Sequence, residues 1–237
     1  MTRLFLSSSF ADVASAFPDF AREPLEGKTV AFIPTASAVE KVTFYVAAGK
    51  KALESLGLVV EELDVSTVAR ETAARAIRES DFIYVTGGNV FHLLRELKRT
   101  GVGSMIVEAI RAGKPYVGES AGSMILSPSI EYARLMDDPA AAPDLADYAS
   151  LGAVPFYTVP HVGCFPFKKA AQRIIDEYGP TLPLRAINNS QAIEVSGDLV
   201  TIVQGAKLKK KPLGKAAMKF LAETSCMQRN ADKPPLT

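Results

Sequence analysis

Ser120 stands between two glycines in the run GESAG, residues 118–122. Strand-forming residues precede this run and small, apolar residues follow it, which favours a sharp turn from a strand into a helix. Such a turn exposes the serine hydroxyl and crowds its neighbours, so small residues are needed beside it. The N–H of Ala121, at the start of the helix, could bind a developing oxyanion. We interpret Ser120 as a nucleophile rather than as part of a glycine-rich packing turn.

Two histidines could serve as the base for this serine, His92 and His161. His92 lies among apolar residues at helical spacing in NVFHLLREL, which favours a half-buried helix residue without a catalytic role. His161 ends a strand-like run in TVPHVG. A histidine at such a place can be purely structural, but His161 is the better partner for Ser120.

A pair of glycines, Gly87 and Gly88, follows another apolar run in TGGN. A backbone N–H of this loop, that of Gly88, could form the second half of an oxyanion hole. The alternative is a phosphate-binding loop, but the patterns G-x-G-x-x-G and G-x-x-x-x-G-K-[ST] are both absent. We therefore expect no cofactor and no metal.

Short apolar runs alternate with helical periods along the first half of the chain. Strands are expected at 3–10, 30–34, 58–66, 81–88 and 114–120, and helices at 42–57, 68–80, 89–101 and 103–113, with another helix opening at 121. This alternation predicts an α/β fold, a doubly wound and mostly parallel sheet with helices on both faces. Ligands of such folds bind beyond the carboxyl ends of the strands, where TGGN and GESAG are expected to lie.

The second half of the chain is less regular. Residues 136–152 are expected to form a loop with at most one helical turn, 153–161 a strand ending at His161, and 167–179 a helix. Residues 182–188 and 191–203 are expected to be closing strands, the latter a hairpin that turns at 196–198.

The composition is that of one globular domain. We expect a single domain over residues 1–223 and a flexible, proline-rich tail over 224–237. The 27 basic and 26 acidic residues nearly cancel, so no bulk attraction to nucleic acid is expected. No apolar run is long enough to span a membrane or to act as a signal peptide. The two cysteines form no CxxC pair, which predicts a cytoplasmic protein without a disulfide framework. We expect a monomer or a homodimer.

Together these motifs resemble those of the peptidase E (aspartyl dipeptidase) family of serine peptidases, relatives of cyanophycinase. The resemblance spans about residues 30 to 200 and is carried by IPTAS (33–37), TGGNVFHLL (86–94), GESAG (118–122), MDDP (136–139), VPH (159–161) and QAIEV (191–195). It implies a flavodoxin-like fold similar to the class I glutamine amidotransferase domain, with serine in place of the cysteine nucleophile. It also implies Ser120 as nucleophile, His161 as base, and Gly88 with Ala121 as oxyanion donors.

The chain departs from this family at the third catalytic position. The family places a carboxylate just before the late strand, and here Asn189 occupies that place. An amide can orient an imidazole by a hydrogen bond, but it cannot stabilise the imidazolium by charge. Glu119, Asp137 or Asp138 could serve as the acid instead, although Glu119 is expected to point away from the nucleophile.

A second departure concerns the substrate. Aspartyl dipeptidases hold the N-terminal Asp of the substrate with a basic residue in a Gly-x-Thr-Arg stretch after the histidine, and the matching region here reads GCFPFKKAAQR. Lys168, Lys169 or Arg173 could supply the cation. The alternative is a solvated helix face, which suits at least two of the three.

The sequence thus predicts a serine peptidase that hydrolyses dipeptides or small peptides, with a preference for N-terminal Asp only by analogy. The alternative is a non-catalytic amidotransferase-like protein that binds a small molecule or peptide. An esterase of the α/β-hydrolase type fits less well, because no histidine follows His161 and no HGGG-type loop is present.

Overall fold

A computed structural model describes residues 1–206, and within them seven strands form one sheet in the order β3-β2-β4-β5-β1-β8-β9. The strands of this sheet are β1 (Arg3–Ser7), β2 (Thr29–Ile33), β3 (Val59–Glu62), β4 (Phe82–Val85), β5 (Tyr116–Glu119), β8 (Gln191–Ser196) and β9 (Leu199–Gln204). β3, β2, β4, β5 and β1 run parallel, and β8 and β9 add an antiparallel hairpin at one edge. The predicted α/β fold with a mostly parallel sheet is confirmed.

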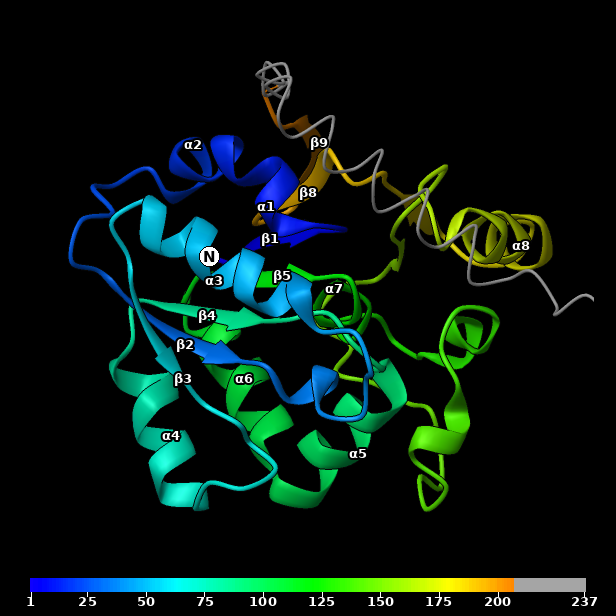
Figure 1. Cartoon of the computed structure of the whole chain (residues 1–237), viewed down its shortest axis with the longest axis horizontal. Coiled ribbons are helices and arrows are strands. Elements are labelled where there is room, and N and C mark those ends of the chain that lie inside the picture. Colours follow the sequence, from blue (N-terminus) through cyan, green and yellow to red (C-terminus); the bar gives the residue numbers. More distant parts are fainter. Residues whose placement is uncertain (207–237) are drawn as a thin grey trace, which may run out of the picture. The chain divides into compact units, whose positions relative to one another are not determined.

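Helices cover both faces of the sheet (Figure 1). They are α1 (Phe10–Val13), α2 (Phe17–Ala21) and α3 (Phe44–Ser55) on one face, and α4 (Arg70–Glu79), α5 (Val90–Thr100) and α6 (Val102–Arg111) on the other. Alternate side chains of each central strand point to opposite faces of the sheet, so each strand contributes to the hydrophobic core on both faces. In β1, Phe5 packs into an aromatic cluster under α1–α3, while Leu4 and Leu6 face the core under α4–α6.

Local hydrogen bonding and backbone conformation set both ends of helix α5. The side chain of Asn89 caps α5 by accepting hydrogen bonds from the backbone N–H groups of Phe91 and His92, each 3.0 Å long. Gly101 ends α5 in the left-handed conformation at φ 73°. The helix expected to open at Ala121 is a single turn, α7 (Ala121–Met124). The short helices α1 and α2 between β1 and β2 were not expected from the sequence.

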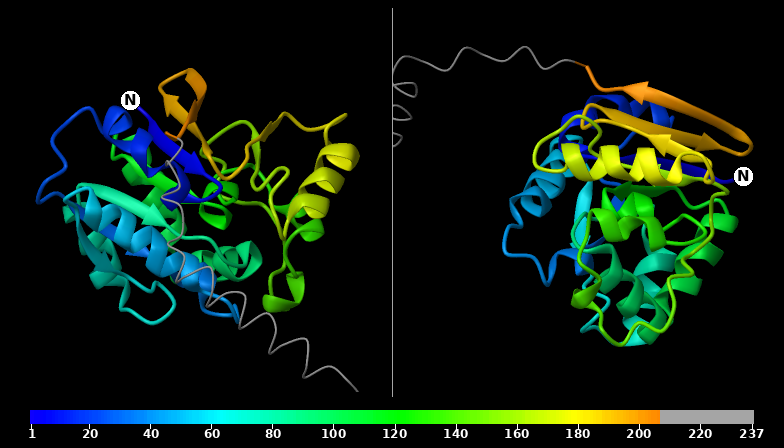
Figure 2. Two further views of the ribbon diagram at one scale, coloured as in Figure 1. Left: turned by 45° about the horizontal axis from the view of Figure 1, so that its top comes forward. Right: turned by 90° about the vertical axis from the view of Figure 1, so that its right-hand side faces the viewer.

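The strand predicted over residues 153–161 is shorter than expected and does not belong to the main sheet. β6 (Tyr157–Val159) pairs in parallel with β7 (Leu184–Ala186) in a separate two-stranded sheet, so neither strand closes the main sheet. His161 follows two residues after β6. Figure 2 shows helix α8 (Lys168–Tyr178) and the hairpin β8–β9 standing apart from each other on the layered body. The expected hairpin turn is confirmed, with Gly197 at φ 61° between the two strands.

The predicted domain end at residue 223 and the tail over 224–237 lie outside the described residues. Cys164 forms no disulfide in the described part, and Cys226 lies beyond it. Among residues 1–206, no helix combines the length and the apolar character needed to cross a membrane.

Candidate active site

Ser120 lies on a strained turn directly after β5. Its backbone angles are φ 48° and ψ −107°, a region that side-chain-bearing residues rarely adopt. A Cβ at Gly118 would lie 2.5 Å from the carbonyl oxygen of Gly122, and a Cβ at Gly122 would collide with the carbonyl of Val85. The glycines at both positions are therefore required by the close approach of the backbone, as expected for a serine elbow.

The hydroxyl of Ser120 is hydrogen-bonded to His161, as the sequence predicts for a nucleophile and its base. Ser120 Oγ lies 2.9 Å from His161 Nε2, and His161 Nδ1 lies 2.7 Å from Asn189 Oδ1. An amide oxygen can only accept, so Nδ1 carries the proton and Nε2 is free to accept from the serine. This arrangement can take a proton from Ser120 without any change of tautomer.

His161 is held by its backbone as well as by its ring. Its φ of 62° is left-handed, and its N–H donates to Ser8 Oγ at 3.0 Å. The ring stacks on Phe167 with centroids 4.9 Å apart. Burial lowers the pKa of His161 below its usual value, partly offset by the hydrogen bond to Asn189, and so favours the neutral imidazole that a base requires.

The end of β1 holds both Ser120 and His161 by hydrogen bonds, which the sequence did not predict. The carbonyl of Ser7 accepts the N–H of Ser120 at 2.9 Å, and Ser8 Oγ accepts from His161 while donating to the carbonyl of Ile187 at 3.2 Å. β1 lies next to β5 in the sheet, so its last residues meet the serine elbow. The signal in the sequence was the run of three small polar residues, Ser7 to Ser9, at the end of an apolar strand.

The glycine loop after β4 faces the same elbow from the other side. A Cβ at Gly87 would lie 3.3 Å from Ser120 Cβ, so the two loops are in contact. Gly88 has φ 131°, and a Cβ there would collide with the carbonyl of Ala36. Within residues 1–206, the N–H groups of Gly88 and Ala121 have no hydrogen-bond acceptor. Both are thus available to a ligand at Ser120.

The three acids considered as alternatives to Asn189 bind other groups. Glu119 accepts from the N–H of Phe10 and the hydroxyl of Tyr84, at 2.9 and 3.0 Å. Asp137 accepts from the N–H of Val90 at 2.9 Å, and Asp138 from that of Ala140, also at 2.9 Å. Within the described residues, the only side chains hydrogen-bonded to the imidazole of His161 are Ser120 and Asn189.

Lys168, Lys169 and Arg173 are exposed on helix α8. Lys168 directly follows Phe167, whose ring stacks on His161, so the first turn of α8 lies beside the site. No hydrogen bond or ion pair of these three side chains occurs in residues 1–206.

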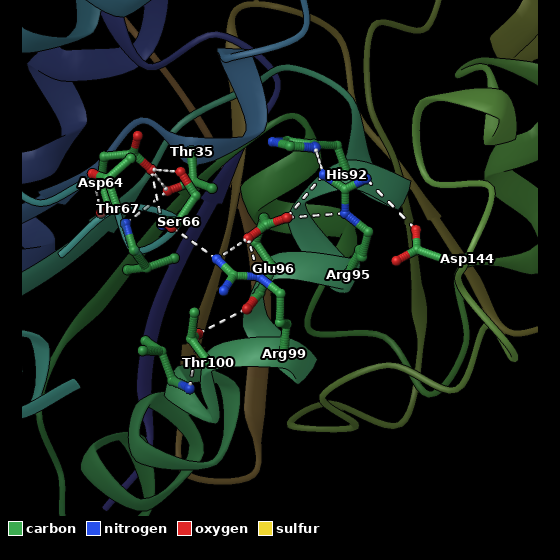
Figure 3. Close-up of polar contacts among 12 residues, drawn as sticks. Thr35, Asp64, Ser66, Thr67, His92, Arg95, Glu96, Arg99, Thr100 and Asp144 are labelled. Atoms are coloured by element: carbon green, nitrogen blue, oxygen red, sulfur yellow. Dashed lines mark hydrogen bonds and ion pairs between the residues drawn. The ribbon is translucent and has the colours of Figure 1, made fainter. Parts of the chain in front are cut away.

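His92 belongs to a polar network around helix α5 and is not hydrogen-bonded to Ser120 (Figure 3). Only 5 % of His92 is exposed, and its Nδ1 lies 2.9 Å from Arg95 Nη2. Burial and the charge of Arg95 lower its pKa. Nearby, Glu96 binds Arg95 and Arg99, and Arg99 also donates to the carbonyl of Ser66. His92 therefore belongs to the packing of α5, as the sequence predicted.

The described residues contain no cluster of three His, Cys, Asp or Glu side chains that could hold a metal ion. A cavity of about 730 Å³ lies between α4 and α6 and is lined by Ser80, Met105 and Lys114 among others. It lies where β4 and β5 begin, whereas Ser120 follows the end of β5. The arrangement around Ser120 brings together a hydroxyl, a neutral imidazole and two free N–H groups, a set that can carry out acyl transfer.

Comparison with known proteins points to one family. A sequence model of peptidase family S51 matches residues 4–203. An uncharacterized peptidase of Listeria innocua is 54 % identical over 200 residues, which cover 84 % of this chain and 95 % of the relative. A peptidase E of Shewanella amazonensis is 33 % identical, covering 73 % of each chain. A crystal structure of a candidate peptidase E protein from Listeria monocytogenes superposes with a TM-score of 0.83 at 52 % identity, covering 86 % of this chain and 98 % of that one.

Proposed function

Because the chain belongs to peptidase family S51 and is therefore a serine-type peptidase, we propose that it hydrolyses dipeptides or small peptides through an acyl-enzyme on Ser120. The observation that carries this proposal is the hydrogen-bonded series Ser120–His161–Asn189 beneath two free backbone N–H groups. Such a constellation is recognised by geometry and roles rather than by sequence position.

In the proposed mechanism, Ser120 Oγ attacks the carbonyl carbon of the scissile peptide bond while His161 Nε2 takes the hydroxyl proton. The N–H groups of Gly88 and Ala121 donate to the carbonyl oxygen as it becomes an oxyanion. His161 then gives its proton to the leaving amine, and the acyl group stays on the serine. Water, deprotonated by the same histidine, releases the acid and restores the enzyme.

Asn189 has an orienting role in this proposal. Its amide oxygen accepts the Nδ1 proton and keeps Nε2 facing the serine. It brings no negative charge to the imidazolium that forms during the reaction, so we expect slower turnover than with a carboxylate at this position.

The substrate proposal is a short peptide with a free N-terminus, N-terminal Asp being one candidate residue. The resemblance to aspartyl dipeptidases and the position of Lys168 beside the site support it. Lys168 would then pair with the substrate carboxylate, and Lys168→Ala would raise KM for Asp-Xaa dipeptides without changing that for Ala-Xaa dipeptides.

Hydrolysis of a panel of dipeptides and Xaa-p-nitroanilides, run beside labelling with a fluorophosphonate probe, tests the function. We expect turnover and one labelled serine in the wild type, and a loss of at least about 10³-fold in Ser120→Ala and His161→Ala. Ser104→Ala, at an exposed serine of α6, is the control for the probe and should behave as the wild type. A wild type that neither labels nor turns over any substrate would refute the proposal.

A further inference from the structure

Phe165 is an apolar side chain that lies almost wholly in solvent beside the candidate active site. It is 93 % exposed, and no other large apolar side chain in residues 1–206 is as exposed. Single exposed apolar residues are common on protein surfaces, so exposure alone gives Phe165 no role. Its place in the loop that follows His161 is what sets it apart.

This loop folds back on the base at its beginning. The N–H of Cys164 donates to the carbonyl of His161 at 2.9 Å, so these four residues form a tight turn. The N–H of Val162 donates to the carbonyl of Ile187 at 3.0 Å and holds the turn against the segment that follows β7. Phe165 directly follows the turn, so its backbone stays close to that of His161.

A second aromatic ring, at the end of the loop, packs on the base itself. Phe167 precedes helix α8 and stacks on His161, with ring centroids 4.9 Å apart and an angle of 26° between the planes. Only Pro166, which is also exposed, separates it from Phe165. Three successive apolar residues thus follow the turn. The last of them packs on the imidazole, and the first two are open to solvent.

The chemistry of the base determines which part of a substrate meets this loop. In the proposed mechanism His161 Nε2 takes the proton of Ser120 and then gives it to the leaving amine. The leaving residue, on the carboxyl side of the scissile bond, must therefore bring its nitrogen within hydrogen-bond reach of His161. The carbonyl oxygen lies instead at the N–H groups of Gly88 and Ala121. Of the two residues of a dipeptide, the leaving residue is thus the one beside the loop after His161.

We infer that Phe165 is a specificity-determining residue, which packs against the side chain of the leaving residue and makes the enzyme prefer dipeptides that end in a large apolar residue. This inference rests on the proposed function of Ser120 and deepens it by naming a substrate class. The leaving side chain is the occupant because Phe167 makes this apolar surface continuous with the base. Among the described residues Phe165 pairs with no other aromatic ring, so a substrate can make apolar contacts there that the protein does not make itself.

This role is confined to the steps in which an amine is present. The leaving residue departs when the acyl-enzyme forms, so Phe165 contacts the substrate during acylation only. By microscopic reversibility, an amine that attacks the acyl-enzyme uses the same surface. In that step the amine nitrogen bonds to the acyl carbon and the ester bond to Ser120 Oγ breaks, while the proton passes from the amine through His161 to the serine.

The first test compares kcat/KM for dipeptides that share one N-terminal residue and end in Gly, Ala, Leu or Phe, in the full-length wild type and Phe165→Ala. We expect the wild type to favour Leu and Phe over Gly by at least about 10-fold, the scale of one or two methylene groups in an apolar site. In Phe165→Ala, kcat/KM should fall about 10-fold for Leu and Phe but less than about 2-fold for Gly. Phe165→Leu, which keeps an apolar side chain, should restore the preference in part.

The second test examines the same surface by aminolysis. The acyl-enzyme formed from an Xaa-p-nitroanilide partitions between water and an added amino-acid amide, and the ratio of peptide to free acid measures how well the amide binds on the leaving side. Leucinamide should be a better acceptor than glycinamide by about 10-fold in the wild type. The two amides should be nearly equal in Phe165→Ala.

Phe44→Ala is the matched control. Phe44 begins α3 and is 76 % exposed, and its ring pairs with that of Tyr45. The ring of Tyr45 in turn lies 3.5 Å from the position of a Cβ at Gly87, in the other loop of the site. Loss of the Phe44 ring should leave the ratio of kcat/KM between Leu and Gly leaving residues unchanged. Melting temperatures of all variants show whether each is folded.

The outcomes distinguish this inference from the proposed function. A wild type that is neither labelled by the fluorophosphonate nor active on any dipeptide overturns both. A labelled wild type that cleaves dipeptides ending in Gly as fast as those ending in Leu overturns the inference and leaves the proposed function intact. An equal fall for every leaving residue in Phe165→Ala also overturns the inference, because it would show a general effect on the loop that holds His161.

Discussion

The hydrogen bond between His161 and Asn189 orients the imidazole but supplies no charge. At 2.7 Å it fixes the proton on Nδ1, and it opposes the lowering of the His161 pKa by burial only in part. A carboxylate at this position would add a Coulombic attraction to the imidazolium. Substitutions at position 189 can therefore separate the orientation of the imidazole from the stabilisation of the imidazolium by charge.

Asn189→Asp should therefore raise the pKa of His161 and increase kcat/KM at pH 8 by several-fold to about 10-fold. The acidic limb of the pH–rate profile should move upward at the same time, because the carboxylate stabilises the protonated ring. Asn189→Ala, which removes the acceptor altogether, should lower kcat by about 10- to 100-fold. Equal activity of all three proteins over the whole pH range would show that position 189 does not orient the base.

At the scale of elements, the amino end of helix α5 is held by a half-buried acid, Asp137. Asp137 accepts the N–H of Val90, the first residue of α5, at 2.9 Å, and Asn89 Nδ2 donates to the carbonyl of Asp138 at 3.0 Å. Burial raises the pKa of Asp137 to about 7, with a further contribution from the charge of Glu40. The helix end next to the glycine loop therefore depends on a carboxyl group that titrates near neutral pH.

The sign of the resulting pH dependence follows from linkage. The folded protein binds the proton of Asp137 more tightly than the unfolded chain, so this residue's contribution to stability decreases as the pH rises from about 4 to about 7. Asp137→Asn keeps an acceptor for Val90 but does not titrate. Its melting temperature relative to the wild type should thus be higher at pH 8 than at pH 4, by about 3 °C or more. Asp138→Asn, at the exposed neighbouring residue, is the control. If the melting temperature of Asp137→Asn differs from that of the wild type by the same amount at pH 4 and pH 8, the prediction is wrong.

At the scale of the whole molecule, the site rests on the centre of the sheet. β4, β5 and β1 each have a strand on both sides, and they carry the glycine loop, the serine elbow and the supporting serines. β3 and β9 are the edge strands and are largely exposed. Buried central strands open only with much of the core, whereas edge strands can open locally.

Hydrogen exchange should reveal this difference directly. Amides of β1 and β5 should exchange at least about 100-fold more slowly than those of β9, since each 1.4 kcal/mol of opening free energy changes the rate tenfold. Peptide-level mass spectrometry of the full chain would measure it. Exchange from β5 as fast as from β9 would mean that the elbow is not supported by a rigid sheet.

Much of the architecture could be read from local patterns. The apolar runs and helical periods of the first half predicted its strands and most of its helices, because burial on both faces of a parallel sheet leaves a clear periodicity. The glycines at 118 and 122 were also predictable, because the sharp turn at Ser120 leaves no space for larger side chains beside it. His161 could also be predicted as the partner of Ser120, because the only other histidine, His92, lies among apolar residues at helical spacing.

Only the tertiary structure decided which distant groups meet at the site. The support of His161 by Ser8, the binding of Asn189 to its ring and the hydrogen bond of Glu119 with Tyr84 of β4 depend on the strand order β4-β5-β1 and on the separate β6–β7 pair. Periodicity reports which face of a strand is buried but not which strand lies beside it. Hydrogen bonds between residues as far apart as Ser8 and His161 therefore leave no local pattern in the sequence, and they become visible only when the strands have taken their places.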